Sequence, residues 1–553
     1  MASKKQQKLE LTWIGKGEQP TLEPRILIEN SEYSCGDPNS ENLLIHGDNL
    51  LALKALEQDY AGKVKCIYID PPYNTGNAFE HYDDNLEHSI WLDLMHQRIS
   101  LLHNLLSNDG IFCLHLDDQE VFYAKVICDE IFGRNMFVSS IAVKSSTPSG
   151  LKTAHRDKTI IKQKDLVLVY KKTKNVTVNP QYTPRPKWDS HYSKYFNRKT
   201  KEIKNLIDIL LEEDIIKSSV SLKSLDINNK KFKQFYLKNK DKIFQTQPTM
   251  PSDEKAKSKA NPKVILTYLD SEGVENFALN GRRFVFLENS LNNLEDESLD
   301  LATLLCDFWT DIDFQNTQNE GGNSFPAGKK PERLVARFLK LFTKENDLVM
   351  DSFLGSGTTA AVAHKMNRRW IGIEMGDHAY SHSHERLKNI VIGNDCSGVS
   401  EMFKWQKGGG FKFYELAPSL LNKDKYDNWV ISKEYNPDML AAAMSKQEGF
   451  SYAPSKDTYW KQGYSVEQDF IFTTTQFVTV ELLDQLQDQL LEGESLLICA
   501  KKFQPECNNK FKNIVLKKIP KMLLGKCEFG KDDYSLNIIN PPVLTGEELG
   551  DEQ

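Results

Sequence analysis

The stretch KVKCIYIDPPYNTGNAFEHYDD, residues 63–84, limits the fold of this chain more than any other feature. Its first eight residues are mostly apolar or β-branched and predict a short buried strand that ends at Asp70. Pro71 and Pro72 cannot extend a hydrogen-bonded ladder, and their rings restrict the backbone. Asp70 and Tyr73 should therefore be held in a rigid turn at the carboxyl end of a strand. In open α/β sheets, ligands bind at that edge.

Strand and helix patterns alternate through residues 41–172 and resume near residue 321, as in a parallel sheet with crossover helices. Between them, residues 179–263 are rich in Lys, Arg, Asn and aromatic side chains. One interpretation is a solvated helical insert. The other is a domain that contacts nucleic acid, because basic side chains neutralise phosphates while aromatic ones stack or pack. The aromatic candidates are Trp188, Tyr192, Tyr195, Phe196, Phe232 and Tyr236.

These changes in pattern predict five segments along the 553 residues. Residues 1–40 are an N-terminal extension. Residues 41–175 and 321–416 are two halves of one α/β core, separated by an insert at residues 176–320. Residues 417–553 are a separate C-terminal α+β domain that carries no recognisable catalytic motif.

The bulk composition, 40% hydrophobic and 27% charged, is that of a globular protein. The net charge of −7 does not itself indicate nucleic-acid binding, although an average can hide a basic patch. The nine cysteines form no CxxC pair, so neither a zinc ribbon nor a disulfide framework is indicated. The sequence shows no apolar run long enough to cross a bilayer, and its start lacks the apolar core of a signal peptide. We therefore expect a cytoplasmic protein that does not associate with membranes.

The second informative stretch is DLVMDSFLGSGTTAAVAHKMNRRWIGIEM, residues 347–375. A predicted strand ends at Asp351, and Gly355-Ser356-Gly357 then opens a helix, so backbone N–H groups can approach a ligand. About twenty residues later the next strand ends in Glu374, and an acid there suits ribose hydroxyls. The stretch is neither a P-loop nor a full GxGxxG fingerprint. It fits a nucleoside cofactor without a diphosphate, such as S-adenosylmethionine. The competing interpretation is a plain strand–helix turn.

Together, DPPY at residues 70–73 and DSFLGSGT at residues 351–358 resemble the motifs of the amino-group DNA methyltransferases. DPPY is the form that this family uses for adenine N6. A catalytic motif that precedes the cofactor motif, with a large insert between them, resembles the beta class. DPPYNTGNAFEHYDD, FPAGKKPERL at residues 325–334 and the chain length look most like the modification (Mod) subunit of type III restriction–modification systems.

This resemblance implies a Rossmann-like, S-adenosylmethionine-dependent core with rearranged motif order and an inserted target-recognition domain. It implies methyl transfer to adenine N6 in duplex DNA after base flipping. The Asp70 carboxylate and the Pro71 carbonyl would accept the two amine hydrogens, Pro72 would stiffen the turn, and Tyr73 would stack on the base. Asn74 and Thr75 would line the mouth of the base pocket. The implied cofactor-binding residues are Asp48, Lys330, Asp351, Phe353, Gly355, Ser356, Gly357, Thr358 and Glu374.

Several of these residues keep a second interpretation. Asp48 either faces the cofactor adenine or caps a helix. The pair Asp117-Asp118 either shapes the base pocket or caps a helix, and we favour capping. The spacing of His378, His382 and His384 suits a metal, but we predict a solvated helix face, because the chemistry requires no metal.

The resemblance also implies partners: duplex DNA, a second copy in a homodimer, and a restriction subunit that carries an ATPase and a nuclease. Residues after Ala417 are a candidate docking surface for that subunit. The alternatives are a stand-alone adenine methyltransferase, a non-catalytic DNA-recognition subunit, and a methyltransferase acting on RNA or on protein glutamine. The last usually carries Asn-Pro-Pro-Tyr after the cofactor motif, whereas this chain has Asp first and the reverse order.

Overall fold

The computed structural model describes residues 10–17, 21–72, 84–147, 156–315, 317–322, 325, 328–466, 468–519, 521 and 523. They divide into two compact units: residues 179–306 form one, and the described residues within 1–178 and 307–553 form the other. Three residues predicted to contact the target base, Tyr73, Asn74 and Thr75, lie outside the described residues.

The larger unit is built on an eleven-stranded sheet with the order β1-β20-β3-β19-β18-β4-β5-β7-β6-β17, and β2 also pairs with β20. The strands from β20 to β5 run parallel, whereas β7 pairs antiparallel with both β5 and β6. The strand bounds are β1 Leu27–Glu29, β2 Cys35–Gly36, β3 Leu43–His46, β4 Val64–Ile69, β5 Leu106–Leu116, β6 Phe137–Lys144, β7 Lys164–Lys171, β17 Phe308–Trp309, β18 Leu348–Asp351, β19 Arg369–Glu374 and β20 Gly410–Leu416.

The sheet departs from the predicted all-parallel pattern at β7. Parallel neighbours need a crossover, usually a helix, whereas antiparallel neighbours do not. Among the described residues between β6 and β7 there is no helix, which agrees with their antiparallel pairing.

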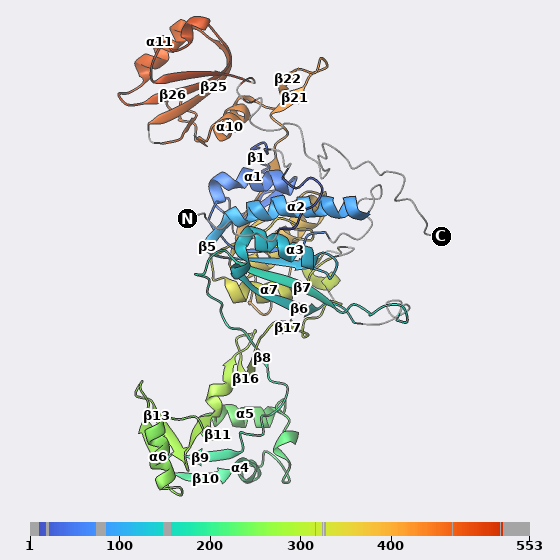
Figure 1. The fold of residues 1–553 in the computed structure, drawn as a ribbon, viewed down its shortest axis with the longest axis vertical. Coiled ribbons are helices and arrows are strands. Elements are labelled where there is room, and N and C mark those ends of the chain that lie inside the picture. Colours follow the sequence, from blue (N-terminus) through green and yellow to red (C-terminus); the bar gives the residue numbers. More distant parts are fainter. Residues whose placement is uncertain are drawn as a thin grey trace, which may run out of the picture. The chain divides into compact units, whose positions relative to one another are not determined.

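Helices cover both faces of the parallel strands, so these strands are almost wholly buried and apolar. Helices α1 to α3 pack over one face of the sheet (Figure 1). Their buried side chains join a core cluster with those of β3, β4, β5, β18 and β19. The ring of Phe338 on α7 lies 5.4 Å from the ring of Tyr68 on β4, with the two planes tilted by 44°, and α8 and α9 follow β18 and β19. The helix bounds are α1 Asn49–Tyr60, α2 Asp84–Leu105, α3 Val121–Cys128, α7 Glu332–Phe342, α8 Thr358–Lys365 and α9 Glu385–Ile392.

The smaller unit, residues 179–306, contains a six-stranded antiparallel sheet and a three-stranded sheet. The strands are β8 Tyr182–Pro184, β9 Lys194–Asn197, β10 Glu202–Asn205, β11 Ile243–Gln247, β12 Leu266–Leu269, β13 Glu275–Leu279, β14 Arg282–Phe286, β15 Leu291–Asn293 and β16 Leu299–Leu304. The helices are α4 Leu206–Glu212, α5 Lys230–Lys238 and α6 Ser252–Ala260.

The aromatic residues of this unit mainly form its core. Of the six that the sequence offered for stacking or packing, five are buried, and Tyr195 is partly buried against the same cluster. They pack, because each finds apolar neighbours inside the unit. The unit is also smaller than the predicted insert, since residues 307–320 belong to the larger unit. There β17 pairs with β6, and Asp311 forms an ion pair with Arg337.

Residues from 417 onward contain a hairpin and a five-stranded sheet in which β25, β26 and β27 run parallel. The bounds are β21 Leu421–Lys423, β22 Trp429–Ile431, α10 Pro437–Gln447, β23 Ser451–Tyr452, β24 Gly463–Tyr464, β25 Asp469–Val478, α11 Val480–Gln489, β26 Ser495–Phe503 and β27 Ile514–Lys518. This region is grouped with the larger unit, and its separation as a domain stays a prediction. Ser419 Oγ donates to Glu23 Oε2 at 2.8 Å and ties the start of the region to the N-terminal part. In the part of the chain that the structure describes, no helix is both long and apolar enough to span a membrane.

Candidate active site

A cavity of about 600 Å³ lies where β4, β18 and β19 end. This is the carboxyl edge of the parallel strands, where open α/β sheets bind ligands. Its volume falls in the range of small-molecule sites. The two motifs that the sequence singled out both contribute to its lining, although they lie far apart in the chain. The cavity is lined by residues that include Asn49, Tyr68, Asp70, Pro71, Pro72, Trp91, Phe325, Lys330, Asp351, Ser352, Phe353, Gly355, Ser356, Thr358, Glu374, Met375 and His378.

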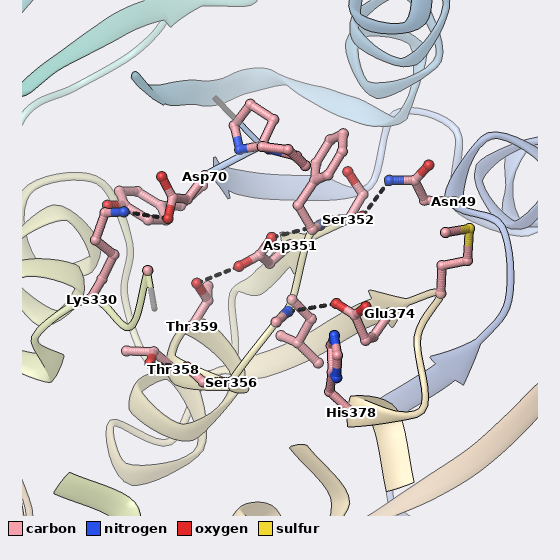
Figure 2. A pocket seen from close by; sticks show the side chains of 18 of the residues that line it. Asn49, Asp70, Lys330, Asp351, Ser352, Ser356, Thr358, Thr359, Glu374 and His378 are labelled. Atoms are coloured by element: carbon pink, nitrogen blue, oxygen red, sulfur yellow. Dashed lines mark hydrogen bonds and ion pairs between the residues drawn. The ribbon is translucent and has the colours of Figure 1, made fainter. Parts of the chain in front are cut away.

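The Asp70 turn follows β4 directly and forms one wall of this cavity. The indole Nε1 of Trp91 on α2 donates to the Pro72 carbonyl at 3.0 Å and fixes the turn from outside. The Asp70 carboxylate Oδ2 forms an ion pair with the Lys330 ammonium, which lies just before α7 (Figure 2). Lys330, which the sequence assigned to the cofactor, thus contacts the predicted catalytic carboxylate.

The glycine turn between β18 and α8 forms the opposite wall. Gly355 and Gly357 have backbone φ angles of 53° and 79°, which residues other than glycine rarely adopt. Glu374 at the end of β19 accepts from the Gly355 N–H at 2.7 Å and from the Gly376 N–H at 3.0 Å (Figure 2). Because a carboxylate offers about four acceptor positions, Glu374 can brace the turn and still accept from a ligand.

Asp351 lies at the end of β18 and is almost completely buried. It accepts from the Phe353 N–H at 2.9 Å and from Thr359 Oγ1 at 2.6 Å. Burial raises the pKa of Asp351 to about 7, and the charges of Asp70 and Glu374 add to the rise. The cavity therefore holds a carboxyl group that changes charge near neutral pH.

Beneath the glycine turn lies a buried group of charged side chains, Glu332, Lys365, Arg386 and Asp395, here called the Glu332 network. Arg386 donates to Thr358 Oγ1 at 2.8 Å, and its other terminal nitrogen donates to Glu332 at 2.7 Å. Lys365 lies 2.9 Å from Glu332 and 2.8 Å from Asp395. This network connects the start of α7 to the glycine turn. Sequence reasoning missed it, because no local pattern relates these residues to one another.

Asp48 and Asn49 are neighbours in the chain but have different roles: the first caps a helix and the second lines the cavity. Asp48 accepts from the Leu51 N–H at 3.0 Å and caps α1, which is one of its two predicted roles. Among the described residues Asn49, rather than Asp48, lines the cavity, and it donates to the Ser352 carbonyl at 2.7 Å (Figure 2). Asn49 was not predicted. Its signal was its place directly after a strand-end acid.

The remaining candidates lie apart from the two motifs or at the rim. Asp117 accepts from the Gln119 N–H at 3.0 Å in the turn before α3, and Asp118 pairs with Lys164. The predicted capping role is wrong, because the N-cap position of α3 is Glu120. The rings of His378 and His382 both meet Phe325 edge-on, whereas the ring of His384 lies against Phe411 and Phe413. Within the described residues, no group of three or more His, Cys, Asp or Glu side chains is arranged to hold a metal ion.

The fold and the site define an α/β protein with a cavity at the carboxyl edge of its sheet, lined by apolar side chains and several acids. Comparison with known proteins gives its family. The N6_N4_Mtase family model, described as DNA methylase, matches residues 64–385. The chain therefore belongs to the DNA methylase family. In this chain the Asp70 motif comes before the glycine turn.

Among curated proteins, the chain is 37% identical over 421 residues to the "Probable type III restriction-modification enzyme HindVI Mod subunit" of Haemophilus influenzae; the match covers 70% of this chain and 56% of that protein. It is 26% identical over 419 residues to the type III restriction-modification enzyme EcoPI Mod subunit of Escherichia phage P1, covering 65% of this chain and 61% of that protein. The chain thus matches somewhat more than half the length of these two relatives.

Solved structures of DNA methyltransferases also match. The PvuII DNA methyltransferase, which is cytosine-N4-specific, is 14% identical with a TM-score of 0.34, and the match covers 66% of this chain and 92% of that one. The M1.HpyAVI–SAM complex is 14% identical with a TM-score of 0.28, covering 62% of this chain and 98% of that one.

Proposed function

We propose that this protein transfers a methyl group from S-adenosylmethionine to adenine N6 in duplex DNA, as the modification and specificity subunit of a type III-like restriction–modification system. The observation that carries the proposal is that the Asp70 turn and the Gly355–Gly357 turn line one cavity. A carboxylate at the end of one strand therefore lies in the same space as a glycine-rich turn with an acid opposite it.

The residues of the cavity fit S-adenosylmethionine. Glu374 would accept from the ribose hydroxyls, and the Gly355 turn, with Asp351 beside it, would hold the zwitterionic amino-acid part. Phe353 and Met375 offer apolar surface to the adenine ring of the cofactor. When bound, S-adenosylmethionine supplies an electrophilic methyl group.

The residues of the protein would contribute by orienting the target amine and by accepting hydrogen bonds from it. The exocyclic amine of adenine is a poor nucleophile, because its lone pair is delocalised into the ring. The Asp70 carboxylate and the Pro71 carbonyl would accept its two hydrogens, so that the nitrogen becomes more tetrahedral and its lone pair localises. Holding the amine in line with the methyl group supplies much of the acceleration. The base reaches the cavity by leaving the helix.

Adenine N6 is favoured over cytosine N4, although the family model covers both. The support is the acidic first residue of DPPY, which resembles the adenine enzymes, together with curated relatives that are described as Mod subunits. We further propose that the unit of residues 179–306 reads the DNA sequence, that the protein is a homodimer, and that a restriction subunit is its partner. Residues 179–263 carry 19 lysines and arginines against 10 acids, which suits a phosphate surface.

The proposal is tested by single-molecule sequencing of DNA from a methylation-free bacterial host that expresses the chain. Wild type should place N6-methyladenine at one sequence motif. Asp70→Ala should abolish the signal, while the purified variant still binds S-adenosylmethionine in isothermal titration. Asp59→Ala, an exposed acid on α1, serves as the matched control and should methylate like wild type.

Other outcomes contradict the proposal at different levels. N4-methylcytosine at a motif would show that the base specificity is wrong. Full methylation by the Asp70→Ala variant would refute the catalytic role of Asp70. Absence of methylation by wild type, with the cofactor bound, would refute methylation by this chain alone.

A further inference from the structure

The ion pair between Lys330 and Asp70 indicates that Lys330 has a role other than cofactor binding. This inference rests on the proposed function. Lys330 Nζ contacts Asp70 Oδ2, with 10% and 19% of the two side chains exposed. A charge-assisted contact so far removed from water constrains where both groups can point. We propose that Lys330 is a positioning residue for methyl transfer, which holds the Asp70 carboxylate in the orientation that accepts from the target amine.

The charges of the cavity explain why Asp70 needs such a partner. Asp70, Asp351 and Glu374 all line the same space, and Lys330 is the one lysine or arginine among the described lining residues. Like charges at short range disfavour ionisation; burial raises the pKa of Asp351, and the charges of Asp70 and Glu374 add to the rise. Only an ionised Asp70 can accept from the amine without offering a proton of its own. A cation beside it counteracts the two neighbouring acids.

Lys330 itself is anchored by the Glu332 network. Glu332, two residues along the chain, is fully buried at the start of α7 and contacts both Lys365 and Arg386. Its backbone N–H donates to Glu320 Oε2 at 2.9 Å. The backbone that carries Lys330 is thus fixed to the same residues that hold the glycine turn. This gives the ammonium a defined place between the two halves of the cavity.

Other titratable groups also face Asp70. Tyr68 precedes it on the same face of β4 and donates to or accepts from His115 of β5, with their atoms 2.8 Å apart. Burial lowers the pKa of His115, and the Lys330 charge lowers it further, while burial raises the pKa of Tyr68. Both groups are therefore neutral near pH 7 and should add little to the pH profile of transfer.

The test compares Lys330→Met with wild type by steady-state kinetics on a duplex that carries the sequenced motif, at saturating DNA and S-adenosylmethionine, between pH 5 and 9. Without the cation, kcat should be lost at a higher pH than in wild type, and its acidic limb should move up by about one pH unit. The plateau of kcat should fall about 10–100-fold, because the carboxylate is less well oriented. The dissociation constant of the cofactor should change less than about threefold.

Two further variants make the result specific. Lys330→Arg keeps the charge and should restore the position of the acidic limb, with part of the rate. Lys344→Met, an exposed lysine after α7, should leave both kcat and its pH dependence unchanged. Repeating the profiles in an Asp351→Asn background removes the titration of Asp351 from the comparison.

The outcomes separate this inference from the proposed function. A Lys330→Met variant with an unmoved acidic limb and a cofactor dissociation constant raised tenfold or more would overturn the inference, and would return Lys330 to the cofactor. If Lys330→Met does not fold, an unmoved kcat profile in Lys330→Arg supports the role of the charge, and a shifted one opposes it. Absence of adenine methylation by wild type overturns the proposed function first.

Discussion

The Glu332 network gives the most direct test of how the core holds its glycine turn. The perturbation is Glu332→Gln, which keeps the shape of the side chain and removes its charge. Glu332 is fully buried and accepts from Arg386 at 2.7 Å, from Lys365 at 2.9 Å and from the Val399 N–H at 3.0 Å. The amide of the introduced Gln has only one oxygen, so its NH₂ group would face either the Lys365 ammonium or the Arg386 guanidinium.

The magnitude follows from which partners remain. Lys365 keeps Asp395 at 2.8 Å, and Arg386 keeps Thr358 and the Ser356 carbonyl. Breaking a buried ion pair by removing one partner costs roughly 3–5 kcal/mol. With these surviving contacts we expect a loss of about 3 kcal/mol in the unfolding free energy of the larger unit. The melting temperature should fall by about 3 °C, since the unfolding entropy grows with size and 1 kcal/mol corresponds to about 1 °C in a unit of this size.

The assay is thermal unfolding followed by circular dichroism, with Glu401→Gln as the control because Glu401 is exposed. The variant should also bind S-adenosylmethionine more weakly, since Arg386 holds the turn through Thr358. A melting temperature within ~1 °C of both wild type and the control would refute the reasoning. It would mean that the network tolerates a neutral centre.

Two other predictions concern the acids of the cavity. The pKa of Asp351 is raised to about 7 in the folded protein, so its contribution to stability is fully present below pH 4 and is lost as the pH rises through 7. Melting temperatures measured from pH 4 to 8 should fall with pH in wild type and much less in Asp351→Asn; equal slopes would contradict the assignment. Glu374→Ala removes the acceptor of the Gly355 and Gly376 N–H groups and the proposed ribose contact. The dissociation constant of S-adenosylmethionine in isothermal titration should rise about 10–100-fold, and an unchanged value would place the ribose elsewhere.

Much of the core followed from local patterns in the sequence. The strands that end at His46, Ile69, Asp351 and Glu374 are short apolar runs that stop near polar or proline positions, and this local composition located them. The order of the motifs along the chain and the break in composition near residue 179 also needed no structure. The roles of Tyr73, Asn74 and Thr75 remain predictions, since those residues lie outside the described part of the chain.

What the sequence did not reveal depends on contacts between distant residues. Pairing of Lys330 with Asp70, and of Glu332 with Arg386, joins segments that no local pattern relates. The aromatic residues of the insert could have faced nucleic acid or packed inward, and their neighbours in the fold decided that they pack. The protonation of Asp351 depends on burial and on two neighbouring acids brought in by other strands. Sequence determines which side chains stand at the strand ends, because backbone preferences are local; tertiary structure decides their charges and partners, because burial and electrostatics act through space.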